Sequence, residues 1–119
     1  MLPDIVERYC KIIDSENIEY VLRKLDCLIR LKRYTQAIDA VMAVDKTSLI
    51  DAFHYSSIGT ILQRLAFYPQ ALTNFRIACK LEPMDSRHHY NLATAYRFSG
   101  EYEQAVSCLD RTIELNPAD

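Results

Sequence analysis

Apolar residues recur through most of this chain at steps of three and four, the spacing that places side chains on one face of an α-helix. The clearest stripe comprises Tyr102, Ala105, Val106, Leu109 and Ile113. Gly100 precedes this stripe and Pro117 follows it. Glycine is favoured just past a helix C-terminus, and proline prevents a helix from continuing. The pattern therefore predicts a pair of helices joined at Gly100.

The pattern repeats with a period of 34 residues. The tetrad Tyr34-Thr35-Gln36-Ala37 returns as Tyr68-Pro69-Gln70-Ala71 and as Tyr102-Glu103-Gln104-Ala105. Helix starts are indicated by capping residues at Ser15, Ser48 and either Asp85 or Ser86, and by Pro69 in a first helical turn. A helical hairpin cannot bury its own apolar faces, so neighbouring hairpins must stack. We therefore predict an all-α stack of antiparallel helix pairs.

The period divides the chain into a capping helix over residues 1–17 and three repeats, 18–51, 52–85 and 86–119, in one structural domain. The first repeat departs from the other two, because Lys24 stands where they have leucine or isoleucine and Leu25 where they have a small residue. Its first helix keeps an apolar stripe that is shifted by about one residue. That stripe comprises Ile18, Val21, Leu22, Leu25, Leu28 and Ile29.

The second and third repeats resemble the tetratricopeptide repeat. The second carries Tyr55, Ile58-Gly59, Leu62, Ala71, Phe75, Ala78 and Pro83, and the third carries His89, Leu92-Ala93, Tyr96, Ala105, Leu109, Thr112 and Pro117. The resemblance covers residues 18–119 and implies a superhelix. Gly59 facing Ala71, and Ala93 facing Ala105, would let paired helices approach closely.

The resemblance also implies a concave groove, lined by the first helix of each repeat, that binds a protein or peptide segment. The matching positions are Glu19, Arg23, Asp26 and Arg30; Phe53, Ser56, Ser57, Thr60, Gln63 and Arg64; and Arg87, Tyr90, Asn91, Thr94 and Arg97. Five arginines against two acids suggest a preference for an acidic segment, although an ordinary solvated face explains them equally well. Phe53 and Tyr90 are either apolar anchors for the segment or packing residues. Only Arg87 comes near the family's carboxylate clamp, so binding of chaperone C-termini is not expected.

Composition narrows the function classes. The net charge of −2 does not favour nucleic-acid binding, and no apolar run approaches the roughly 20 residues of a membrane span. We expect a cytoplasmic chain whose scattered cysteines (Cys10, Cys27, Cys79 and Cys108) are buried thiols. His54 stands alone, and His88 and His89 point in different directions on a helix, so no metal site is expected from them. The chain has no phosphate loop or catalytic motif, which predicts neither an enzyme nor a cofactor.

The last helix raises two further expectations. Ala105, Leu109, Thr112 and Ile113 should leave an apolar side uncovered, which predicts either a homodimer through this helix or a fragment of a longer protein. Residues 89–100 also resemble, through one helix, the tetratricopeptide modules that precede bacterial sulfotransferase domains. An accessory domain of a larger sulfotransferase-like enzyme is therefore the alternative to a binding module.

Overall fold

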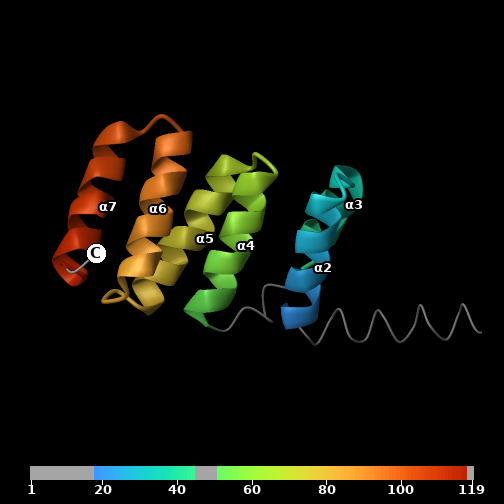
Figure 1. Ribbon diagram of the computed structural model, residues 1–119, viewed down its shortest axis with the longest axis horizontal. Helices are drawn as coiled ribbons and strands as arrows, with labels where there is room; N and C mark the ends of the chain where they lie inside the picture. The colour runs from blue at the N-terminus through green and yellow to red at the C-terminus, as the bar shows by residue number, and fades with distance from the viewer. Residues whose placement is uncertain (1–17, 45–50, 118–119) are drawn as a thin grey trace, which may run out of the picture. The chain divides into compact units, whose positions relative to one another are not determined.

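A computed structural model describes residues 18–44 and 51–117 of the 119-residue chain. These residues form six α-helices and no strand, which confirms the prediction of an all-α helical repeat fold (Figure 1). The helices are α2 (Ile18–Arg30), α3 (Tyr34–Met42), α4 (Ala52–Arg64), α5 (Tyr68–Leu81), α6 (Ser86–Phe98) and α7 (Tyr102–Leu115). The expected capping helix over residues 1–17 lies outside the described residues.

The described helices fall into two compact units, one with the α2–α3 pair and one with α4 to α7. In the second unit consecutive helices pack side by side in chain order (Figure 1). In addition, α4 contacts α6. The expected stacking of one hairpin on the next is therefore present between the second and third repeats. No described helix combines the length and apolarity that crossing a bilayer requires.

The three hairpin turns share one backbone design at 34-residue intervals. Lys32, Ala66 and Gly100 have φ of 61°, 67° and 80°. In each turn the amide after this residue bonds back across the helix end, as in Phe67 N to Leu62 O at 2.8 Å. This hydrogen-bond pattern is a Schellman motif, which satisfies carbonyls that the helix leaves unpaired. The prediction for Gly100 is confirmed, and two non-glycine residues adopt the same conformation.

The first helix of each later repeat begins at an aspartate cap. Asp51 Oδ1 accepts a bond from His54 N, and Asp85 Oδ1 accepts one from Arg87 N, both at 3.0 Å. Asp85 therefore fulfils its prediction. The cap of α4 (Ala52–Arg64) is Asp51, and the predicted cap Ser48 lies outside the described residues. Pro69 lies in the first turn of α5, as expected, and Ser15 lies outside the described residues.

Close packing inside the second repeat depends on Gly59. A Cβ added to Gly59 would lie 2.8 Å from Phe75 Cε1, and Phe75 is only 2% exposed. The nearest neighbour of this site is thus Phe75, whereas the sequence pointed to Ala71. Further links join α5 to α6, where the Tyr68 and Phe98 rings stack at 6.0 Å. The second and third repeats are therefore joined by an aromatic contact.

The apolar stripes of the first and last described helices, α2 and α7, differ in burial. In α2 the six residues of the predicted apolar stripe are all buried, which confirms its shifted register. On α7, Tyr102, Val106, Leu109 and Ile113 are exposed in this structure. Ala105 was wrongly assigned to the uncovered side, since it is 5% exposed and packs inward.

The expectation of buried thiols is only partly met. Cys27 is exposed, while Cys79 and Cys108 are half-buried. Burial raises the pKa of the Cys79 thiol to about 11, so the thiol is protonated at neutral pH. Cys10 lies outside the described residues.

Candidate functional site

A hollow of about 250 Å³ lies between the first helices of the second and third repeats. Its walls come from α4, from the first half of α6 and from the residue that follows α5. The lining residues are Phe53, Ser56, Ser57, Thr60, Glu82, Arg87, His88 and Asn91. Six of these were predicted groove residues, and Glu82 and His88 were not. Predicted groove residues from the second and third repeats thus lie around one concave surface.

The floor of this hollow is held by a bond between the two helices. Ser56 Oγ lies 2.8 Å from His88 Nδ1, and the two side chains come from positions 32 residues apart. Ser56 is 7% exposed and His88 is 4% exposed. Ser56 is therefore a structural contact between α4 and α6, and not the exposed groove residue that the sequence suggested.

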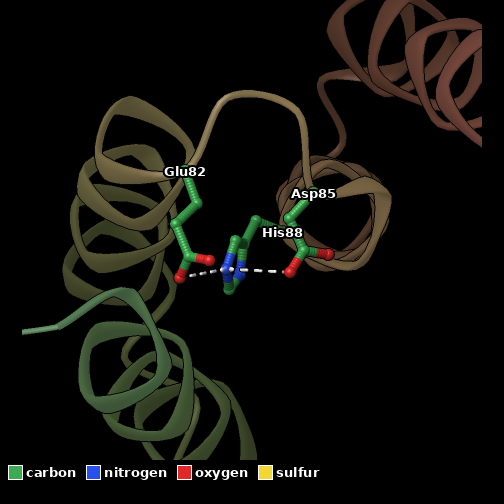
Figure 2. Close-up of side chains that lie close together, drawn as sticks. All are labelled: Glu82, Asp85 and His88. Carbon is green, nitrogen blue, oxygen red and sulfur yellow. Dashed lines mark ion pairs between the residues drawn. The ribbon is translucent and has the colours of Figure 1, made fainter.

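The other ring nitrogen of His88 points toward two carboxylates (Figure 2). His88 Nε2 lies 3.5 Å from Glu82 Oε1 and 3.7 Å from Asp85 Oδ2. Among the described residues this nitrogen has no hydrogen-bond partner, although it is buried. This cluster was not predicted from the sequence, because only the histidines and cysteines were considered as metal ligands there and the acids were left out. The spacing of Glu82, Asp85 and His88 at every third position was the available signal.

Arg87 is already engaged within its own turn. Its Nε and Nη2 donate to Asp85 at 3.1 and 2.7 Å, a bidentate pair. The bond from the Arg87 guanidinium holds the pKa of Asp85 at about 2, below the ordinary 3.8. The arginine keeps most of its side chain exposed, at 79%. Part of its hydrogen-bonding capacity is therefore used within this turn.

The remaining predicted groove residues are distributed as follows. Phe53 and Tyr90 are 57% and 55% exposed. Thr60, Arg64 and Arg97 are exposed, whereas Ser57, Gln63, Asn91 and Thr94 are half-buried. In the first unit Arg23 is exposed, and Arg30 bonds to Asp26 at 3.0 Å.

Residues 86–119 match the family model described as the tetratricopeptide repeat. The chain is a tetratricopeptide-repeat protein. This match covers the third repeat, in which α6 and α7 form the hairpin and His88 and Asn91 line the hollow.

Two curated tetratricopeptide relatives resemble this chain. The Photosystem I assembly protein Ycf3 of Acaryochloris marina is 33% identical over 91 residues, which are 72% of this chain and 55% of that protein. Superkiller protein 3 of Schizosaccharomyces pombe is 28% identical over 67 residues, which are 56% of this chain and 5% of that protein. This chain thus spans about half of one relative and a small part of the other.

Solved structures show the same tetratricopeptide fold. MamA of Desulfovibrio magneticus matches with a TM-score of 0.72 at 18% identity, over 93% of this chain and 64% of that one. A chain of the CopN–Scc3 complex matches with a TM-score of 0.68 at 23% identity, over 85% and 59%. At 18% and 23% identity these solved structures show the likeness of fold alone.

Proposed function

We propose that this tetratricopeptide protein binds a protein or peptide segment in the hollow between α4 and α6 and does not act as an enzyme. The observation that carries the proposal is the gathering of Phe53, Ser57, Thr60, Arg87 and Asn91 around one concave surface. An exposed aromatic ring beside hydroxyl, amide and guanidinium groups suits a peptide, which offers both apolar side chains and backbone hydrogen-bonding groups.

An acidic segment remains the preferred guest in this proposal. Arg64 and Arg97 are exposed on α4 and α6, the two helices that form the hollow. Arg87 can donate to a further carboxylate only by dividing its guanidinium N–H groups between that carboxylate and Asp85. Glu82 adds a negative charge to the hollow. The electrostatic contribution should therefore be modest, and Arg64 and Arg97 add positive charge on the same two helices.

The first experiment selects peptides from a displayed library and measures their affinity by fluorescence anisotropy. Phe53→Ala should weaken binding about 10-fold or more, because exposed aromatics often carry interface energy. Tyr102→Ala is the matched control, since Tyr102 is an exposed aromatic on α7, away from the hollow. Equal effects of the two substitutions would refute binding at this surface.

The second experiment tests the charge preference. Selected peptides should be rich in Asp and Glu, and their affinity should fall as salt rises from low to physiological strength. Arg64→Gln together with Arg97→Gln should flatten this dependence. Affinity that ignores salt would remove the acidic preference while leaving peptide binding intact.

The alternative of an accessory domain within a larger sulfotransferase-like enzyme stays a prediction, as does the cytoplasmic location. Sequencing the parent gene beyond codon 119 tests the accessory-domain alternative. A stop codon at that point would exclude it.

A further inference from the structure

Three side chains converge where the second repeat joins the third (Figure 2). Glu82 is the residue after α5, Asp85 caps α6, and His88 lies in the first turn of α6. One ligand atom from each, a carboxylate oxygen or an imidazole nitrogen, lies within 4.8 Å of the other two. The turn between the helices thus brings together three donor atoms of the kind that bind metal ions.

The histidine is oriented as a metal ligand would be. His88 is 4% exposed, and Ser56 Oγ holds its Nδ1 at 2.8 Å. If Nδ1 carries the proton and donates it to Ser56, the Nε2 lone pair points between the two carboxylates. A ligand histidine commonly bonds through its second nitrogen in this way, which fixes its ring and its tautomer. The buried Nε2 otherwise lacks a hydrogen-bond partner among the described residues.

The two distances from the imidazole nitrogen suit a small ion. Zinc binds nitrogen and oxygen ligands at about 2.0–2.2 Å, so two ligands of a tetrahedral site lie roughly 3.4 Å apart. The two distances from His88 Nε2 are 3.5 Å to Glu82 Oε1 and 3.7 Å to Asp85 Oδ2. Small side-chain rotations would therefore close the site. Calcium and magnesium prefer oxygen ligands throughout, so the imidazole favours zinc or a similar transition ion.

We propose that Glu82, Asp85 and His88 bind one divalent transition ion of the zinc class at the junction of α5 and α6. Three protein ligands leave a fourth position for water or for a group on a guest, because Glu82 and His88 also line the hollow. Arg87 opposes the ion in two ways. Its charge repels a cation, and its Nη2 already bonds to the same Asp85 Oδ2 at 2.7 Å.

The preceding repeat offers an internal comparison. Asp51 and His54 keep the same spacing, and their side chains lie 3.5 Å apart. The position 34 residues before Glu82 is Ser48, which has no carboxylate. With one ligand fewer, the Asp51–His54 pair should bind the ion much more weakly than the three-ligand cluster.

Calorimetric titration of the whole chain with zinc chloride at pH 7, without chelators, tests the site. The unsubstituted protein should bind one ion, and its melting temperature should rise with zinc because the ion binds the folded state. Glu82→Gln and Asp85→Asn should each lower the affinity at least 10-fold, while Arg87→Gln should raise it. Glu103→Gln is the matched control, because it removes the same charge from an exposed glutamate on α7.

Cobalt absorption distinguishes this cluster from the cysteines, whose thiolates give an intense near-ultraviolet charge-transfer band with cobalt. Cobalt bound without that band, and displaced by zinc, supports the proposal. Three results would overturn it: a thiolate band at the bound ion, unchanged affinity in Glu82→Gln, or no binding by the unsubstituted protein. Asparagine still caps a helix, so a folded Asp85→Asn protein keeps the comparison valid.

Discussion

The contact between Gly59 and Phe75 allows a sharp prediction. Replacing a glycine inside a helix by alanine usually stabilises a protein, but here it should destabilise it. Alanine at position 59 would place its Cβ 2.8 Å from Phe75 Cε1 and 3.0 Å from Cδ1 and Cζ. The Phe75 ring is 2% exposed and surrounded by other side chains, so it has no free space to enter. One added methyl group must therefore displace a ring or separate two helices.

The two opposing contributions can be compared. Alanine in a helix interior is favoured over glycine by about 0.8–1.0 kcal/mol. Overpacking a well-filled core costs about 1–3 kcal/mol. We expect Gly59→Ala to lower the free energy of unfolding by ~1 kcal/mol in net terms. The exposed Ser107→Ala on α7 is the control for helix propensity alone, and it should stabilise by a few tenths of a kcal/mol.

The other repeats suggest how the clash can be relieved. At the positions of Gly59 and Phe75, the third repeat has Ala93 and Leu109, and the first has Leu25 and Val41. Across the three repeats, a larger side chain at the Gly59 position goes with a smaller one at the Phe75 position. Phe75→Leu alone should cost ~2 kcal/mol for lost burial and a cavity, but combined with Gly59→Ala it recreates the third repeat's pair.

Urea unfolding followed by circular dichroism measures all four proteins of this double-mutant cycle. We expect a coupling energy of roughly 1 kcal/mol in favour of the double variant. Strictly additive effects, or a Gly59→Ala protein stabilised like Ser107→Ala, would refute the packing argument. A changed slope against urea would signal a loss of two-state behaviour, and the comparison would then use hydrogen exchange of α4 and α5 amides.

Three further predictions concern the turns, the cap and the last helix. Ala66 has φ of 67°, so Ala66→Gly should stabilise by ~0.5–1 kcal/mol in urea unfolding, and a loss of stability would contradict the strain. The folded pKa of Asp85, about 2, lies below its ordinary 3.8, so its contribution to stability is present above pH 4 and lost as pH falls toward 2. The stability difference between the unsubstituted protein and Asp85→Asn should therefore shrink over that range, and a constant difference would exclude the effect. The exposed stripe on α7 predicts concentration-dependent association in sedimentation, weakened by Val106→Lys with Ile113→Lys, whereas a strict monomer at high concentration would exclude it.

Local pattern was enough to place the helices and the repeat family. Tyr-x-Gln-Ala at 34-residue intervals, the apolar steps of three and four, and Gly100 after α6 each act within a few residues of the chain. Helix formation and hairpin turning depend on such short-range chemistry, and each repeat presents it again. The first repeat followed the same rule, since its shifted stripe from Ile18 to Ile29 is buried as the spacing required.

Tertiary structure decided which side chains meet. Ser56 is bonded to His88, the partner of Gly59 is Phe75, and Arg87 is held by Asp85. Two of these contacts depend on how neighbouring helices rotate and approach, and side-chain volume and helix packing set that geometry. Periodicity places a residue on a helix face, but only the packed helices determine what lies opposite it.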